Sequence, residues 1–143
     1  MFSKTCEYAI KVMIYISSIE GRNDKVGLDE IANAIDSPKA FTAKILQQLV
    51  RAKILDSMRG RSGGFSLPSA KQVCFSDIII AIDGDKLLKG CVLGFRACSD
   101  ESPCPIHHKF KPIRQSMTQT FESTSLEELK GIMEQNEVYL VEP

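Results

Sequence analysis

The sequence lacks an apolar run that could cross a bilayer, for which about 20 consecutive residues are needed. It also lacks the pattern of an export signal, because Lys4, Glu7 and Lys11 interrupt the apolar residues of the first segment and no small-residue cleavage site follows. The chain has 143 residues, of which 43% are hydrophobic and 25% charged, which suits one soluble domain with an accessory element. We therefore expect a cytoplasmic protein with no membrane partner.

Signatures of common enzymes are missing as well. The glycine-rich segment RGRSGG at residues 59–64 lacks the Lys-Ser/Thr pair that a phosphate-binding P-loop requires. Cys104 with His107 or His108 is the best candidate for a nucleophile and its base, yet no protease or reductase signature surrounds them. The sequence therefore argues against an enzyme.

Net charge is also absent, since 18 basic residues balance 18 acidic ones, but the charges are unevenly distributed. Between Asp36 and Lys71 there are seven cations against two acids, a balance of +5. From Glu122 onward there is one cation against six acids, a balance of −5. An acidic tail thus hides a basic middle segment, and a localised basic segment is typical of nucleic-acid binding.

Apolar spacing predicts three helices in the first third of the chain. Thr5 can cap the first helix and Gly21 can end it, and a short second helix is expected over residues 28–35. Ser37 is a suitable N-cap for the third helix, with Pro38 at its first position, where a missing N–H does no harm. The third helix is expected to bury Phe41, Ile45, Leu46, Leu49 and Val50.

A period-two pattern over residues 54–58, the glycine-rich turn and then residues 65–67 predict a β-hairpin with a basic tip. Ser76 can cap a fourth helix that Gly84 closes. The expected fold is mainly α with a small β-hairpin: a winged helix-turn-helix domain over residues 1–84, then a cysteine loop, a long dimerisation helix and the acidic tail over residues 85–143.

Two short helices followed by a basic hairpin are the order of elements in a winged helix-turn-helix. In that arrangement the second helix reads base edges in the major groove, while hairpin cations reach phosphates or the minor groove. Arg59 and Arg61 suit the hairpin role, because a narrow minor groove concentrates negative potential. The alternative is a core helix followed by a solvated turn, and the confinement of basic charge to these two elements favours DNA.

Three cysteines crowd one loop, as Cys91, Cys98 and Cys104 in the spacing C-x6-C-x5-C, with His107 three residues further on. Three thiolates and an imidazole can hold zinc or an iron–sulfur cluster. The C-x2-C pairs typical of zinc sites are absent, which favours a cluster. Unligated loop thiols, and a metal carrier with no DNA role, are the alternatives. Cys6 and Cys74 are expected to be small buried hydrophobes.

Apolar residues recur in a helical seam after the cysteine loop, at Phe110, Ile113, Met117 and Phe121. This seam could pack on its own domain. It better fits a two-fold dimer interface, because a winged helix that reads a palindromic site needs a partner. A capping box at Ser125-Leu126-Glu127-Glu128 then predicts a last short helix.

The run SPKAFTAKILQQLVRAKILDSMRGRSGGFSLP, with the preceding LDEIANAI, resembles the DNA-binding region of the IscR/NsrR family of bacterial transcription regulators. The wing pattern S-x-R-G-x-x-G-G-[FY]-x-L of that family is the most specific match. The opening CEYAIKVMIYI is similar to the first helix of the family, so the resemblance covers nearly the whole chain. It implies a homodimer bound to a palindromic operator in double-stranded DNA. Where this chain has Lys53, the family commonly has glycine.

The resemblance also implies roles for particular residues. Arg59 would enter the minor groove, and the residues that would approach the major groove and backbone are Ser37, Lys39, Ala40 and Lys44. The three loop cysteines would hold a two-iron or four-iron cluster that senses iron–sulfur status, nitric oxide or oxidants. The fourth ligand would be His107, or alternatively Glu7 from the partner subunit.

Overall fold

The computed structural model describes residues 1–19, 25–136 and 139–142. In chain order its elements are α1 (Lys4–Ile19), α2 (Leu28–Ala34), α3 (Lys39–Arg51), β1 (Asp56–Met58), β2 (Gly64–Ser66), α4 (Phe75–Asp83), α5 (Lys86–Lys89), α6 (His107–Ser123) and α7 (Leu126–Gln135). The predicted fold, mainly α with one small hairpin, is confirmed. In the described ranges, no helix combines the length and apolar character that a membrane span needs.

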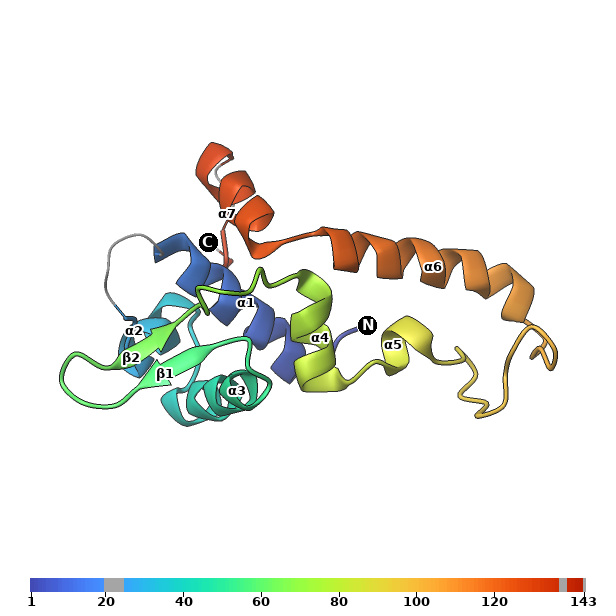
Figure 1. The fold of residues 1–143 in the computed structure, drawn as a ribbon, viewed down its shortest axis with the longest axis horizontal. Helices are drawn as coiled ribbons and strands as arrows, with labels where there is room; N and C mark the ends of the chain where they lie inside the picture. Colours follow the sequence, from blue (N-terminus) through green and yellow to red (C-terminus); the bar gives the residue numbers. More distant parts are fainter. Residues whose placement is uncertain (20–24, 137–138, 143) are drawn as a thin grey trace.

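The molecule has two parts, which we call the body and the arm (Figure 1). The body consists of α1 to α4, the hairpin and α7. The arm is residues 85–123, which include α5, the cysteine loop and α6, and it extends away from the body. The expected boundary at residue 84 coincides with the end of α4, but α7 returns to the body instead of continuing the arm.

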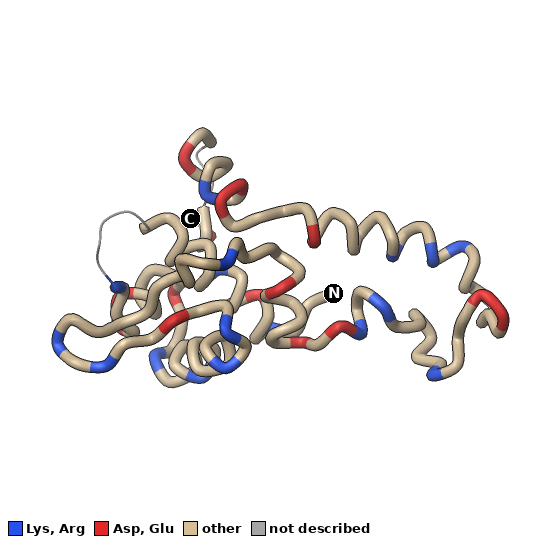
Figure 2. The backbone as a smooth tube through the Cα atoms, in the orientation of Figure 1, with Lys and Arg blue, Asp and Glu red and all other residues tan. Residues whose placement is uncertain are grey.

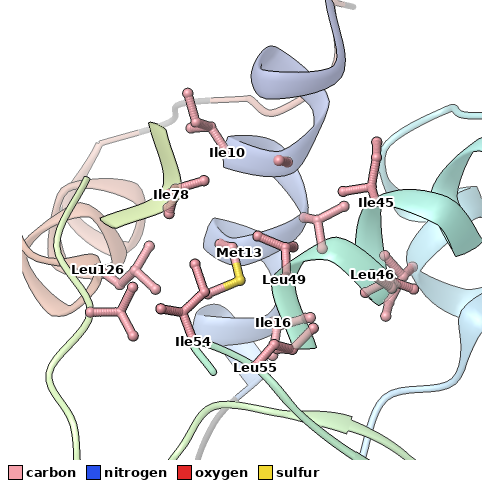
Figure 3. Close-up of a cluster of buried hydrophobic side chains, with 14 of the residues drawn as sticks. Ile10, Met13, Ile16, Ile45, Leu46, Leu49, Ile54, Leu55, Ile78 and Leu126 are labelled. Atoms are coloured by element: carbon pink, nitrogen blue, oxygen red, sulfur yellow. The ribbon is translucent and has the colours of Figure 1, made fainter. Parts of the chain in front are cut away.

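The core of the body surrounds α1. Met13 and Ile16 of α1 lie beside Leu49 of α3, and Ile78 of α4 and Leu126 of α7 complete the cluster (Figure 3). All five side chains are no more than 3% exposed. Burying each one contributes about 1.5–3 kcal/mol, so several elements from distant parts of the sequence are held against one helix. This shared core fixes the orientation of α3.

Two of the predicted helix caps are wrong. Thr5 lies inside α1, and the backbone N–H of Cys6 instead donates to Ser3 Oγ at 3.1 Å. Ser76 is likewise inside α4, where the backbone N–H of Cys74 donates to the carboxylate of Asp77 at 2.9 Å. Each helix begins two residues earlier than predicted, because Ser3 accepts a backbone N–H at the start of α1 and Asp77, inside α4, accepts the N–H of the N-cap residue Cys74. The expected stop at Gly21 lies outside the described residues.

The turn between α2 and α3 also differs from the expected cap. Pro38, not Ser37, is the N-cap of α3, and Asp36 takes a left-handed conformation with φ of 49°. The backbone N–H of Ser37 donates to the Ala32 carbonyl at 2.9 Å. Its hydroxyl oxygen is buried and has no hydrogen-bond partner among the described residues. The tight turn is therefore stabilised by the backbone and not by a serine cap.

The hairpin forms as predicted, with Asp56 opposite Ser66 and Met58 opposite Gly64. On its other side, β2 is bridged to Val26, whose backbone exchanges hydrogen bonds of 2.9 and 2.8 Å with Phe65. A Cβ atom on Gly64 would lie 2.7 Å from the carbonyl oxygen of Val26, and its φ is 144°. Glycine is thus required where the hairpin approaches the segment before α2.

The joint between α3 and the hairpin holds a residue in a backbone conformation that favours glycine. Lys53 has a φ of 60°, a left-handed conformation that costs a non-glycine residue roughly 1–2 kcal/mol. This chain holds a lysine in that conformation, followed at once by the buried Ile54 and Leu55. Burial of these two residues anchors the turn and offsets its strain.

The seam on α6 is divided between the two parts of the molecule. Phe121 packs against Phe2 and Phe75, with ring centroids 5.7 and 5.1 Å apart, and belongs to the edge of the body core. Ile113, near the other end of the seam, is 60% exposed. At Phe121 the seam therefore packs on the body of its own chain, which was the alternative considered for it, because the α6–α7 joint folds back onto α4.

Candidate DNA-binding surface and cysteine site

The exposed face of α3 and the tip of the hairpin form one basic surface. Figure 2 shows lysine and arginine positions along α3 and at the turn that joins β1 to β2, on the same side of the body. Among the residues predicted to bind DNA, Lys39, Ala40, Lys44, Arg59 and Arg61 are exposed. The core fixes the opposite face of α3, so this surface is presented on a rigid helix.

Two predicted residues behave differently from the rest of this surface. Lys39 pairs with Asp29 of α2 at 2.7 Å, and both side chains are more than 60% exposed, so the pair is weak and open to exchange with a phosphate. The hydroxyl oxygen of Ser37 is buried and does not face solvent. In this conformation the Ser37 hydroxyl is not presented to a major groove.

A cavity of about 360 Å³ links α3 to the hairpin and adds residues that sequence reasoning missed. Its lining includes Gln47 and Arg51 of α3 together with Met58 and Arg59 of the hairpin. Gln47 and Arg51 lie one and two turns beyond Lys44 on the exposed face, and this helical spacing is the signal that could have identified them. The basic surface thus extends along α3 and continues onto the hairpin.

The three loop cysteines converge as predicted. The Sγ atoms of Cys91, Cys98 and Cys104 all lie within 4.8 Å of one another, and those of Cys91 and Cys104 are 3.6 Å apart. All five cysteines of the chain are free thiols. Three sulfur donors gathered at one point are suited to a soft metal ion or an iron–sulfur cluster.

The surroundings of the thiols favour deprotonation of one of them. Desolvation raises the pKa of Cys91, but hydrogen bonds from the backbone of Phe95 and Leu93 and from the other two thiols outweigh it and lower this pKa to about 7. For Cys98, a backbone hydrogen bond from Cys104 lowers the pKa, whereas desolvation and the neighbouring thiols leave it raised overall. The thiolate is the form of cysteine that binds metals.

His107 joins this group from the first turn of α6. Its side chain is 5% exposed, and its Nδ1 lies 3.1 Å from Cys98 Sγ. The other ring nitrogen, Nε2, lies 2.9 Å from Oδ1 of Asp100. Hydrogen bonds from Lys111 and His107 lower the pKa of Asp100 to about 2. Asp100 and Lys111 were not identified from the sequence. The spacing of His107 and Lys111, one helical turn apart, is the signal that could have placed Lys111 beside the histidine.

Glu7 and the two remaining cysteines lie elsewhere in the chain's own fold. Glu7 is on α1 in the body, where it pairs with Lys4 at 3.3 Å, whereas the cysteine loop is in the arm (Figure 1). Cys6 is buried in the core, as expected, and desolvation by burial raises its pKa to about 12. Cys74 is only half-buried and is the N-cap of α4, so it is not the buried hydrophobe that was predicted.

Comparison with known proteins matches the chain to one family. The family model described as Rrf2, iron-dependent transcriptional regulator, matches residues 2–131. An HTH-type transcriptional regulator of Aquifex aeolicus is 30% identical over 139 residues, which are 95% of each chain. An rrf2-like regulator of Rhodobacter capsulatus is 31% identical over 138 residues, 90% of this chain and 91% of the relative.

Solved structures share the fold. CymR, described as the global cysteine regulator of B. subtilis, aligns with a TM-score of 0.70 at 24% identity, over 92% of this chain and 96% of the other. T. potens IscR aligns with a TM-score of 0.71 at 17% identity, over 96% and 89% of the two chains. Together with the family match and the relatives at 30% identity, this likeness leads to one conclusion: the chain belongs to the Rrf2 family of transcriptional regulators and is not an enzyme.

Proposed function

We propose that this chain is a homodimeric, sequence-specific regulator whose DNA binding depends on an iron–sulfur cluster held by Cys91, Cys98 and Cys104. The observation that carries the proposal is the convergence of the three Sγ atoms within 4.8 Å in a chain that also has a rigid basic reading surface. Loss or modification of the cluster by iron–sulfur shortage, nitric oxide or oxidants would be the signal.

The basic surface supports the DNA part of the proposal. Ala40 and Lys44 are exposed near the start of α3, where a recognition helix contacts base edges, and Lys39 is placed to meet phosphates. Arg59 and Arg61 lie in the turn between β1 and β2, from which they would reach a minor groove beside the site that α3 occupies. Target DNA in this proposal is a palindromic operator in double-stranded DNA.

The exposed part of the α6 seam supports a dimer. Ile113 is 60% exposed and lies with Met1, Pro112 and Met117 along a shallow, largely apolar groove. Phe110 is half-buried on the same helix. A second copy of α6 would cover this groove, and pairing of two reading heads is what a palindromic operator requires. Phe121 would support the interface indirectly, because it packs on the core of its own protomer and holds the end of α6 there.

The donor set fits an iron–sulfur cluster. The three Sγ atoms lie within 4.8 Å of one another, and Nδ1 of His107 lies 3.1 Å from one of them, Cys98 Sγ, so His107 is the fourth ligand in this proposal. Glu7 of the partner subunit is the alternative fourth ligand, because a dimer would bring the loop of one chain near α1 of the other. When bound, the cluster supplies an inorganic group that reacts with oxidants and nitric oxide. This chain's own residues bind it and connect its loop, through α6, to the body.

Anaerobic purification tests the cluster directly. We expect coloured protein that contains iron and acid-labile sulfide, and loss of the colour in Cys91→Ser, Cys98→Ser and Cys104→Ser. Cys74→Ser is the matched control, since this half-buried cysteine lies outside the loop and its variant should stay coloured. Colourless protein with stoichiometric zinc, or no metal after reconstitution, would contradict the proposal. A metal-free regulator and a zinc protein are thus separate outcomes of one measurement.

A further inference from the structure

A chain of hydrogen bonds leads from the cysteine site to the surface of the arm through Asp100. Asp100 Oδ1 lies 2.9 Å from Nε2 of His107, and Lys111 Nζ lies 2.7 and 2.5 Å from the two carboxylate oxygens. We propose that Asp100 is a positioning residue, which fixes the ring of His107 so that Nδ1 faces Cys98 and would be available to a metal held by the thiols. This inference rests on the proposed function, because it assigns a role in holding the cluster.

The chemistry of the pair determines the tautomer of the ring. An ionised carboxylate can only accept hydrogen bonds, so the Nε2 atom beside Asp100 has to carry the proton. In neutral His107 the unprotonated nitrogen is then Nδ1, the atom that lies 3.1 Å from Cys98 Sγ. Lys111 Nζ lies 2.7 and 2.5 Å from the two oxygens of Asp100 and forms an ion pair with its carboxylate. The lone pair that can bind a metal is therefore the one directed toward the thiols.

The backbone places Asp100 and Lys111 where they can support His107 as a metal ligand. His107 and Lys111 are separated by one helical turn on α6, so both side chains project from the same face of the helix. Asp100 comes from the loop between Cys98 and Cys104, and it is 63% exposed while His107 is 5% exposed. A carboxylate beside the first turn of α6 is also favoured by the helix dipole. Histidine ligands commonly have such a carboxylate partner, which orients the ring.

A purely structural role is the competing explanation, in which Asp100 only ties the loop to α6. The two explanations differ in what happens to the ring nitrogens when the carboxylate is removed. If Asp100 is only a structural tie, Asp100→Ala should loosen the loop and leave the tautomer of His107 as it is in the wild type. The positioning role predicts a change in the tautomer of His107 that Asp100→Glu, which keeps the carboxylate, largely restores.

Nitrogen NMR of the metal-free protein makes the first test. The chain has two histidines, so His107→Ala assigns the ring signals. In the wild type we expect a protonated Nε2 and an unprotonated Nδ1 for His107, and in Asp100→Ala a mixture of both tautomers. Glu101→Ala is the matched control, because it removes an exposed carboxylate one residue further along the loop. An unchanged tautomer in Asp100→Ala, or a wild type with Nδ1 protonated, would overturn the inference.

Pulsed EPR of the reduced, cluster-loaded protein makes the second test. With nitrogen-15 histidine, the wild type, Asp100→Glu and Glu101→Ala should show coupling of one ring nitrogen to the cluster. Asp100→Ala should lose this coupling or lose the cluster in air about 10-fold faster. A loaded wild type whose spectrum and cluster lifetime match those of Asp100→Ala would overturn the inference. If no variant takes up iron, the proposed function is wrong, and the NMR result alone then decides whether Asp100 fixes the ring.

Discussion

The body and the arm differ in how much of their internal packing is hydrophobic. In the body, side chains from α1, α3, α4 and α7 are packed into one core, and several of them, including Met13 and Leu49, are fully buried. In residues 85–123 the buried side chains are Leu88, Cys104 and His107. The arm joins the body through apolar residues such as Phe121, whereas α6 is tied to the start of the cysteine loop by polar contacts, such as the bond from Arg114 to the carbonyl of Gly90 at 2.9 Å.

Several apolar residues of the arm are left exposed in the single chain. Val92, Leu93, Phe95, Ile106 and Ile113 are each more than a third exposed. Hydrophobic burial in the body provides stability that one chain supplies alone, whereas the arm needs further groups to cover its apolar residues and bind its thiols. In the function proposed above, a single protomer therefore already has the geometry that reads DNA. The arm, which would sense the signal, would be completed by a cofactor and a second copy of the chain.

Removal of one core side chain should give the largest difference between the two parts. Leu49→Ala leaves a cavity in a fully buried site of the body, so the free energy of unfolding should fall by about 2–5 kcal/mol. Ile113→Ala, the matched change in the arm, should cost under about 1 kcal/mol in the monomer because that side chain is already exposed. Urea denaturation followed by circular dichroism measures both. Equal losses would show that the arm belongs to the same core.

Charges placed in the seam should break the dimer. Ile113→Asp together with Met117→Asp would bury two carboxylates in an apolar interface, at a cost of several kcal/mol, and should give monomers. Light scattering gives the mass. Ile80→Asp is the control, since Ile80 is 46% exposed on α4, outside the arm. A variant that remains dimeric would place the interface elsewhere.

Two substitutions on the basic surface should weaken DNA binding in distinct ways. Arg59→Ala should cost on the order of 1–3 kcal/mol at particular operator positions, as expected for a groove contact. Lys39→Ala should weaken binding to all sequences and reduce the slope of log K against log salt by about 0.9, as expected for one phosphate contact.

Titrations with an operator and a scrambled duplex at several salt concentrations separate these two effects. Lys89→Ala, a cation of the arm, is the control and should bind as the wild type does. Normal binding by both Arg59→Ala and Lys39→Ala would move the reading surface away from α3 and the hairpin.

The smallest effect is expected at the turn between α2 and α3. Loss of a serine N-cap costs about 1 kcal/mol, but the Ser37 hydroxyl has no partner among the described residues. Removal of an unpaired buried hydroxyl in Ser37→Ala should therefore leave the free energy of unfolding unchanged or raise it by under about 1 kcal/mol. Denaturation of the variant at equilibrium gives the sign. A clear loss of stability would restore Ser37 as the cap.

Elements with strong local signals were predicted well from the sequence. The apolar stripe of α1, the glycine-rich hairpin and the Ser125 cap of α7 all occur in the structure, and Glu128 N–H donates to Ser125 Oγ at 3.1 Å. The predicted cap of α1 failed because the cap that forms is held by a residue distant in sequence. Ser3 rather than Thr5 accepts the N–H of Cys6 at the start of α1, and both the backbone N–H and the hydroxyl of Ser3 donate to Asp83 at the end of α4.

The sequence by itself determined the order of elements, the basic segment and the set of loop cysteines, because periodicity, turn residues and spacing are properties of neighbours along the chain. Only the tertiary structure decided that Phe121 packs in the body, that α7 covers α1 and that Asp100 meets His107 and Lys111. Each of these depends on which surfaces lie together after the chain returns on itself. Packing of that kind is settled by the shape of the whole core, and no local pattern records it.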